Sequence, residues 1–187
     1  TMNDLQEKKS LIYLIGFMGS GKSTVGPILA NTIGYAFIDL DHYIEIRTHK
    51  KIGEIFAAEG EKKFRNMERE TLRSLLASSA TVISLGGGTV TNDEILKLIK
   101  TSGVVVYLKS DVEQIFNRLR TKGDRPMLRD ENGNLLDGEH LRLKITTLLE
   151  QREVYYNQAD IIIHTDDKRI GNTVDELAKK LRKFIPS

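Results

Sequence analysis

The sequence predicts an α/β fold, in which helices pack against a parallel β-sheet, and two observations lead to this prediction. First, apolar runs of strand length recur along the chain, at residues 11–15, 36–40, 81–85, 103–108 and 160–164. Most of them lack strict alternation of apolar and polar residues, which is typical of strands buried on both faces. Second, segments with helical character lie between these runs, and this alternation favours parallel strands joined by right-handed crossovers.

The helical segments are predicted from their composition and from the signals at their ends. The first one, at residues 22–33, ends at Gly34, a residue that suits a helix C-cap. A long and charge-rich helix is expected over residues 61–77, and a shorter one begins after Thr91. Asp111 is a good N-cap for the helix that follows it. The expected helices cover residues 22–33, 61–77, 92–100, 111–120, 139–158 and 172–184.

One segment, residues 122–138, fits neither strand nor helix. It is rich in Gly, Asp, Asn and Arg and is long for a connection in an α/β protein. It is either a disordered surface loop or a mobile lid over a site. A chain of 187 residues suits a single domain, so we expect residues 1–187 to form one.

Composition excludes some classes of protein. The formal net charge is only +2 and Lys and Arg alternate with Asp and Glu, which argues against a nucleic-acid binder. There is no cysteine, so we expect the reducing cytoplasm. The first ten residues lack the apolar stretch of a signal peptide, and no apolar run approaches the roughly 20 residues of a membrane span. A compact domain without an obvious exposed apolar helix predicts a monomer.

The strongest motif lies between the first apolar run and the first helix. Residues 16–23 fit the pattern G-x-x-x-x-G-K-S/T of the phosphate-binding P-loop, in the strand-to-helix context that it requires. Glycines let backbone N–H groups turn inward around phosphates, and the helix N-terminus adds partial positive charge. Lys22 would reach the β- and γ-phosphates, and the Ser23 hydroxyl would bind Mg²⁺. The motif predicts a nucleotide but no particular reaction.

A pair of carboxylates, Asp39 and Asp41, follows the second predicted strand. Ligands of α/β sheets bind at the carboxyl ends of strands, and in extended geometry residues two apart point the same way. One carboxylate could hold Mg²⁺ through water, and the other could accept a proton from an attacking hydroxyl. Alternatively, Asp41 is only the N-cap of a helix that begins with HYIEI.

Further polar residues are weaker signals when taken singly. Arg65 and Glu68 share a helix face, either as a surface ion pair or with Glu68 orienting Arg65 toward a substrate carboxylate. Three glycines, 86–88, directly follow a strand and allow a ligand to approach the backbone closely. Arg125 lies in the candidate lid and Arg152 lies on a late helix.

Taken together, these motifs resemble the shikimate kinase family over nearly the whole chain. The matching stretches are GFMGSGKST, DLD after the second strand, FRNME, the triple glycine, DRPML, and the late arginine in QREVYYNQAD, all in the order and spacing of the family. The resemblance implies a P-loop NTPase-like, three-layer α/β/α fold with a five-stranded parallel sheet. It also implies a helical substrate-binding region at about residues 41–70 and a mobile lid at about residues 121–139.

The resemblance also implies the reaction, transfer of the γ-phosphate of ATP to the 3-hydroxyl of shikimate on the way to aromatic amino acids. The implied ATP site comprises Gly19, Ser20, Gly21, Lys22, Ser23, Thr24, Arg125 and Arg169, with Arg118 or Arg120 against adenine. The implied shikimate site comprises Asp41, Arg65, Glu68, Gly86, Gly87, Gly88 and Arg152. Ser23 and Asp39 would bind Mg²⁺. Lys22, Asp41 and Arg125 would be catalytic, with Asp41 as the candidate base.

Two alternatives remain beside this interpretation. One is another small-molecule P-loop kinase, for gluconate or for a nucleotide, although two arginines and a triple glycine suit a polyol that bears a carboxylate. The other is a catalytically silent relative with a binding or regulatory role. The presence of Lys22, Asp41 and Arg65 argues against the silent relative, because such chains tend to lose these residues.

Overall fold

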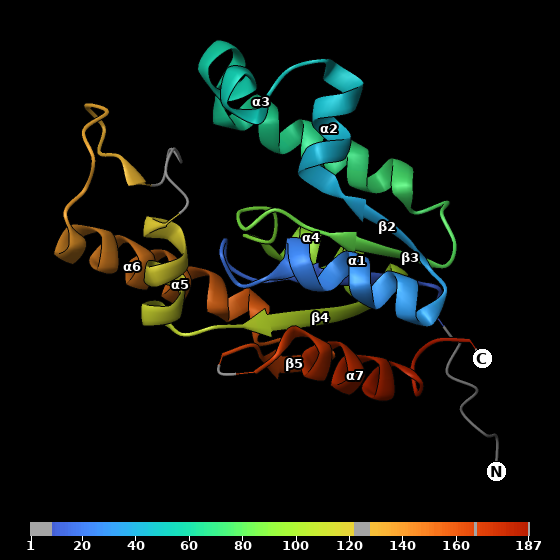
Figure 1. Ribbon diagram of the computed structural model, residues 1–187. Coiled ribbons are helices and arrows are strands. Elements are labelled where there is room, and N and C mark those ends of the chain that lie inside the picture. The colour runs from blue at the N-terminus through green and yellow to red at the C-terminus, as the bar shows by residue number, and fades with distance from the viewer. Residues whose placement is uncertain (1–8, 122–127, 167, 187) are drawn as a thin grey trace.

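The computed structural model describes residues 9–121, 128–166 and 168–186, and it confirms the α/β fold (Figure 1). The strands are β1 (Leu11–Ile15), β2 (Ala36–Asp39), β3 (Thr81–Ser84), β4 (Val104–Lys109) and β5 (Ile161–His164). The helices are α1 (Lys22–Ile33), α2 (Leu40–Thr48), α3 (Ile52–Leu75), α4 (Asp93–Ser102), α5 (Val112–Arg120), α6 (Gly138–Tyr156) and α7 (Ile170–Leu181).

The strands form one five-stranded sheet in the order β2-β3-β1-β4-β5, and every neighbouring pair is parallel. The central strand β1 is buried at every position, as its unbroken apolar sequence predicts. Because the strands are parallel, their carboxyl ends meet at one edge of the sheet. In Figure 1 the arrows of β2, β3 and β4 point to the same side of the molecule. The loops that carry the motifs leave the sheet there.

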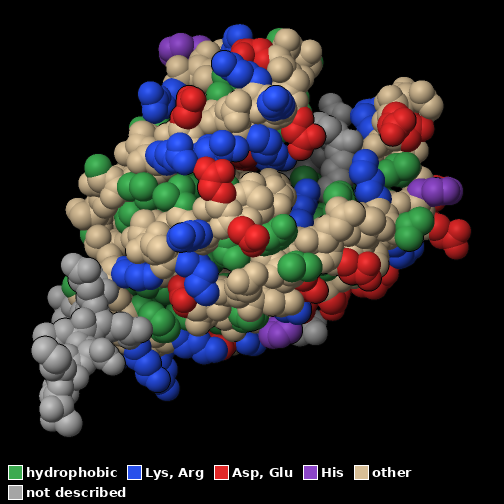
Figure 2. Space-filling model, turned by 180° about the vertical axis from the view of Figure 1, so that it is seen from behind, with side chains coloured by type: hydrophobic (Ala, Val, Ile, Leu, Met, Phe, Trp, Pro, Cys, Tyr) green, Lys and Arg blue, Asp and Glu red, His purple; other side chains and the backbone are tan. Residues whose placement is uncertain are grey.

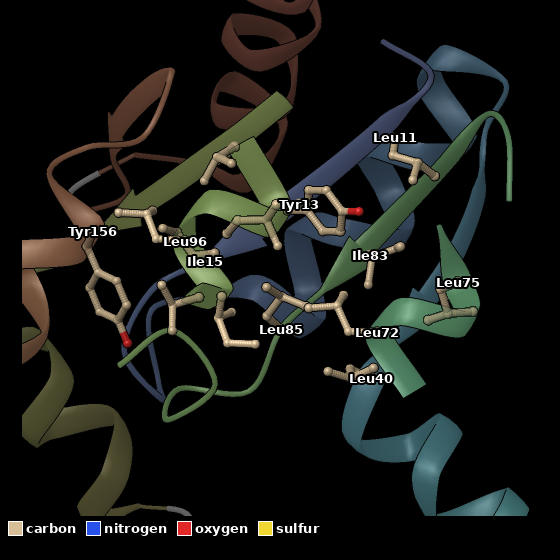
Figure 3. Packing of buried hydrophobic residues seen from close by; sticks show 14 of the residues in the cluster. Leu11, Tyr13, Ile15, Leu40, Leu72, Leu75, Ile83, Leu85, Leu96 and Tyr156 are labelled. Carbon is tan, nitrogen blue, oxygen red and sulfur yellow. The ribbon is translucent and has the colours of Figure 1, made fainter. Parts of the chain in front are cut away.

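Helices cover both faces of the sheet and make three layers. On one face, Val25 and Leu29 of α1 and Leu177 of α7 pack against β1 and β4. On the other face, Leu72 of α3 and Ile99 of α4 pack around the side chains of β1 and β3, and Tyr156 closes this cluster at the end of α6 (Figure 3). The apolar positions of β1, β3 and β4 therefore alternate between two cores.

Most predicted helix ends are confirmed. Gly34 ends α1 in the left-handed conformation (φ 74°), and the Asp111 side chain accepts the Gln114 N–H at 2.8 Å as the N-cap of α5. The largest difference is α3, which begins at Ile52, well before the expected residue 61. It contains a break at Gly60 (φ 81°), so the sequence pattern indicates only the part that follows this glycine.

A third apolar cluster holds α5 and α6 against the loop that follows β1. Phe17, from the loop after β1, packs with Phe116 and Leu119 of α5 and Ile145 of α6. Leu128 joins the same cluster at the start of the described part of the segment between α5 and α6.

The described part of the predicted lid is ordered. Residues 128–136 form a short hairpin in which Arg129 and Leu135 make an antiparallel bridge. At its tip, the Asp130 carboxylate accepts the backbone N–H groups of Asn132 and Asn134 at 2.9 and 2.8 Å. The interpretation of a disordered loop is therefore wrong for these residues. Movement of the hairpin as a lid stays a prediction.

Charged side chains of both signs lie beside one another over the face shown in Figure 2. Ion pairs such as Arg73 with Glu94, 2.9 Å apart, join charges of opposite sign at the surface of the protein. Within the described ranges, no helix is both long and apolar enough to cross a membrane.

The close approach of β1 to the start of β4 generates a stability prediction. A Cβ atom on Gly103 would lie 2.5 Å from Cε2 of Tyr13 and 2.7 Å from the carbonyl oxygen of Leu11, which is held in the sheet. We therefore expect Gly103→Ala to lower the free energy of unfolding by about 1–3 kcal/mol. Gly171→Ala is the matched control, since a Cβ there meets nothing within 4 Å. Urea unfolding of both variants tests this, and equal stability would contradict it.

Candidate active site

The loop between β1 and α1 has the backbone of an anion cradle. Gly16, Gly19 and Gly21 all have positive φ angles (147°, 81° and 101°), which side chains rarely adopt. A Cβ on Gly16 would also lie 2.6 Å from the carbonyl oxygen of Leu108. Gly21 is the N-cap of α1 and supplies no capping side chain, so the amides of the first helical turn face the loop. An anion there would meet N–H groups and the positive end of the helix dipole.

Lys22 begins α1 and folds back over this loop. Its side chain is only 8% exposed, and its ammonium donates hydrogen bonds to the carbonyls of Gly16 at 2.6 Å and Phe17 at 3.0 Å. The loop backbone therefore holds the charge of the lysine beside the amides of the cradle.

A pocket of about 300 Å³, the P-loop pocket, surrounds this loop. Its lining includes every residue from 19 to 24 of the implied ATP site, together with Asp39, Asp41, Gly86, Gly87 and Arg118. These residues of the ATP site are Gly19, Ser20, Gly21, Lys22, Ser23 and Thr24. Elements far apart in the sequence thus meet at one edge of the sheet.

The two arginines near the end of α5, Arg118 and Arg120, have different surroundings. Arg118 lines the P-loop pocket, and its Nη1 donates to the carbonyl of Gly19 at 2.9 Å. Arg120 is exposed, lies against the Phe116 ring and does not line this pocket. Asp166, from the loop after β5, lies 3.7 Å from the Arg118 guanidinium. The last helical turn therefore presents only Arg118 to the P-loop.

Two other predicted residues on the nucleotide side are not placed in the pocket. Arg169 is exposed as the N-cap of α7, and the residues of that loop that line the P-loop pocket are Thr165, Lys168 and Ile170. Arg125 lies outside the described residues, so its role stays a prediction.

The second pocket, the α2–α3 pocket, encloses about 1190 Å³ beside the first. One wall is apolar, with Ile52, Phe56 and Phe64 from α3, and another carries Arg65 and Glu68. The two pockets share Met18, Asp39, Asp41, Gly86 and Gly87 in their linings. A group bound in one pocket can therefore reach a group bound in the other.

The geometry of the two aspartates differs from the predicted one. Asp39 ends β2 and is itself the N-cap of α2, because its Oδ1 accepts the His42 N–H at 3.0 Å. Asp41 lies in the first turn of α2. The expectation of extended geometry and the alternative that Asp41 caps the helix are both wrong. The two carboxylates nevertheless line the same pockets, since a strand end and a first helical turn are adjacent.

The pKa of the Asp41 carboxyl is strongly raised by its surroundings. Burial raises its pKa from 3.8 to about 6, the negative charges of Glu68 and Asp39 add to the rise, and the positive charges of Lys22 and Arg65 oppose it. Asp41 Oδ1 is buried and has no hydrogen-bond partner among the described residues. A carboxylate in this state is suited to accept a proton from a bound hydroxyl.

Arg65 is held by a buried acid. Its Nη1 lies 2.6 Å from Oε2 of Glu68, a side chain that is 2% exposed. The hydroxyl of Thr89 donates to the other oxygen, Oε1, at 2.6 Å. Burial by itself lowers the pKa of Arg65, but the charge of Glu68 outweighs it and the net pKa is raised. The pair is therefore not the ordinary surface ion pair that its sequence spacing also allows.

The triple glycine permits three close contacts at once. A Cβ on Gly86 would lie 3.0 Å from Asp41 Oδ1, and one on Gly87 would lie 3.0 Å from the Met18 nitrogen. A Cβ on Gly88 would lie 2.5 Å from Arg65 Nη2. Side chains at these positions would displace the aspartate, the P-loop or the arginine.

Arg152 reaches the site from α6. Its guanidinium carbon lies 5.0 Å from the centre of the Phe17 ring, and its Nη1 would be 3.6 Å from a Cβ on Gly87. This nitrogen is buried without a hydrogen-bond partner in the described part of the chain. Arg65 and Arg152 therefore approach the triple glycine from different elements, and together they suit a ligand with a carboxylate.

Sequence reasoning missed several residues that shape the site. Met18 lines both pockets, Thr89 completes the environment of Glu68, and Tyr156 donates a hydrogen bond to the Gly87 carbonyl at 2.6 Å. Arg129, on the ordered hairpin, lines the α2–α3 pocket. Met18 and Tyr156 lie inside matching stretches and Thr89 directly follows the triple glycine, which was a usable signal, but Arg129 is marked only by its place in the candidate lid.

Comparison with known proteins agrees with this geometry. A model of the shikimate kinase family matches residues 18–183. The shikimate kinase of Chlorobium limicola is 52% identical over 176 residues, which cover 94% of this chain and 88% of that protein. The crystal structure of shikimate kinase from Bacteroides thetaiotaomicron has a TM-score of 0.85 at 35% identity, covering 92% of this chain and 98% of that one.

A solved shikimate kinase from Acinetobacter baumannii, in complex with shikimate, has a TM-score of 0.83 at 34% identity and covers 94% of each chain. These likenesses extend over both pockets and nearly the full sequence. The chain belongs to the shikimate kinase family.

Proposed function

We propose that this protein transfers the γ-phosphate of ATP to the 3-hydroxyl of shikimate, giving shikimate 3-phosphate and ADP. The observation that carries the proposal is the junction of the two pockets. The P-loop pocket suits a nucleotide, the α2–α3 pocket suits a small anionic polyol, and Asp41 lines both. Phosphoryl transfer requires positioning of the two reactants and neutralisation of charge, and the residues at this junction supply both.

On the nucleotide side, the P-loop backbone and Lys22 bind the phosphates. The amides of residues 19–24 surround the β-phosphate, and the Lys22 ammonium stabilises negative charge on the transferred group. Arg118 lies against the adenine from the end of α5. The contact of Arg118 with the Gly19 carbonyl favours it over Arg120 for this role.

The residues of the P-loop pocket also fit Mg²⁺. This ion keeps several waters and takes only one or two protein oxygens beside those of the phosphates. Ser23 and Asp39 both line the P-loop pocket, and their hydroxyl and carboxylate oxygens would hold it. When bound, Mg²⁺ neutralises charge on the phosphates.

On the acceptor side, Arg65 and Arg152 bind the carboxylate of shikimate and Glu68 orients Arg65. The glycines 86–88 lie along the ring. Asp41 receives the proton of the 3-hydroxyl as this oxygen attacks the phosphorus, and its raised pKa improves it as a base. The bond between the γ-phosphorus and the bridging oxygen breaks, and ADP leaves.

The experiment that tests this function is steady-state ADP production with ATP and Mg²⁺. Shikimate, gluconate and a nucleoside monophosphate are supplied as parallel acceptors. We expect saturable activity with shikimate alone. Activity only with another acceptor would overturn the acceptor assignment, and ATP binding without any activity would favour a binding or regulatory role.

Arg65→Ala tests the carboxylate clamp. Loss of a charge-assisted fork, worth roughly 1.5–3 kcal/mol, should raise the KM for shikimate about ten- to a hundredfold with a smaller effect on the KM for ATP. Arg69→Ala is the matched control, because Arg69 lies one turn further along α3 and does not line the α2–α3 pocket. An unchanged KM for shikimate in Arg65→Ala would show that the clamp is assigned wrongly.

Arg118→Ala and Arg120→Ala together test the adenine contact. Because only Arg118 faces the P-loop pocket, its loss should raise the KM for ATP by about tenfold, more than the loss of Arg120 does. Initial rates at saturating shikimate give both values. A larger effect of Arg120→Ala would reverse the assignment.

The raised pKa of Asp41 predicts a stabilised variant. An acid whose pKa is higher in the folded chain contributes stability at low pH, and this contribution is lost as the pH rises from about 4 to about 6. Asp41→Asn replaces the titrating carboxyl by an amide, so the variant does not lose stability in this way as the pH rises. At pH 8, without nucleotide or Mg²⁺, its free energy of unfolding should exceed that of the wild type by up to about 3 kcal/mol, and at pH 4 the two should converge. Urea unfolding at both pH values measures this. A variant no more stable at pH 8 would contradict the described environment of Asp41.

A further inference from the structure

Tyr156 lies between two parts of the proposed acceptor site, Arg152 and the triple glycine. Arg152 comes from α6, and the triple glycine follows β3. Tyr156 is the last residue of α6 and is 1% exposed. In Figure 3 its hydroxyl points toward the loop that follows β3.

The hydroxyl binds one part directly and lies close to the other, since Arg152 Nη1 would be 3.6 Å from a Cβ on the same Gly87. It donates to the Gly87 carbonyl at 2.6 Å. Burial raises the pKa of Tyr156 to about 12, so the hydroxyl keeps its proton near neutral pH and remains a donor, while the positive charge of Arg152 opposes this rise. Arg152 and Tyr156 are four residues apart on a helix, so their side chains share one face.

The ring of Tyr156 is held rigidly. It packs against the Tyr107 ring with 5.1 Å between the ring centres. The Tyr107 hydroxyl donates to Glu153 at 3.0 Å, and Lys109 lies 2.9 Å from the same carboxylate. The ring of Tyr107 on β4, rather than its hydroxyl, therefore holds the Tyr156 ring in place.

We propose that Tyr156 is a positioning residue for the acceptor, whose hydroxyl holds the Arg152 guanidinium and the Gly87 backbone in one fixed arrangement. The inference rests on the proposed function, since it assigns Arg152 to the shikimate carboxylate and Gly87 to the ring. Without the hydroxyl, the arginine and the loop move independently, and the bound acceptor must order them. The loss therefore falls on acceptor binding rather than on ATP binding.

Tyr156→Phe and Tyr107→Phe form a matched pair. Each removes one buried hydroxyl from the same stacked pair and leaves the ring, but only the hydroxyl of Tyr156 reaches the acceptor site. We expect Tyr156→Phe to raise the KM for shikimate about tenfold, a typical effect of one lost hydrogen bond to a positioned group, with the KM for ATP changed less than about twofold. Tyr107→Phe should leave both KM values within about twofold of the wild type. Partial unfolding would raise the KM for both substrates, because it lowers the fraction of enzyme that can bind either one, so it cannot produce an effect on shikimate alone.

A double-mutant cycle with Arg152→Ala separates positioning from general packing. If Tyr156 acts through Arg152, its replacement in the Arg152→Ala background should change the KM for shikimate by much less than in the wild type. Equal fold-changes in the two backgrounds, or an unchanged KM in Tyr156→Phe, would overturn the inference. Absence of wild-type activity with shikimate would instead overturn the proposed function, so the two failures are distinguishable.

Discussion

The site depends on how closely the backbone of the loop after β3 approaches the P-loop. A Cβ on Gly87 would lie 3.0 Å from the Met18 nitrogen, and a Cβ on Gly16 would lie 2.6 Å from the Leu108 carbonyl. A side chain at Gly16 would force the P-loop away from β4, and one at Gly87 would press the loop after β3 against the P-loop backbone. Because β1 is the central strand and β3 is its neighbour, their carboxyl ends bring the two glycine loops together. The P-loop pocket and the α2–α3 pocket share a wall for this reason.

A balance of buried charge follows from this close packing. Asp41 and Glu68 are acids in a confined space, and Lys22 and Arg65 are the cations that act on Asp41. Glu68 is neutralised by Arg65 and accepts the Thr89 hydroxyl, whereas Asp41 Oδ1 has no hydrogen-bond partner among the described residues. The arrangement thus keeps one acid as a fixed support and leaves the other perturbed, which is how active sites assign different roles to similar groups.

The fold and the nucleotide side of the site could be predicted from the sequence because their signals are local. The apolar runs, the helix-ending Gly34 and the P-loop motif each lie within one short stretch, and the structure agrees with them. Sequence reasoning missed the break in α3 at Gly60 and expected Asp41 rather than Asp39 as the possible cap of α2. Both features depend on backbone angles, which the residue pattern does not reveal. Nothing local separates Arg118 from Arg120, which lie in the same helical turn.

Contacts between distant residues could not be predicted. Thr89 meets Glu68 across 21 residues and Tyr156 meets Gly87 across 69, and such pairs form only when the sheet order is known. These contacts join the predicted groups Glu68 and Gly87 to residues that the motifs do not single out. The motif residues therefore predict which chemical groups the site contains, but not which neighbouring residues hold those groups in place.

The central claim is that the two pockets bring phosphate and hydroxyl together at Asp41. A crystal structure with ADP, Mg²⁺ and shikimate tests it most directly. We expect the shikimate carboxylate to lie between Arg65 and Arg152, with a ring hydroxyl within hydrogen-bond distance of Asp41 and facing the β-phosphate of ADP. Shikimate bound away from the shared wall, or with its carboxylate against Lys22, would contradict this claim.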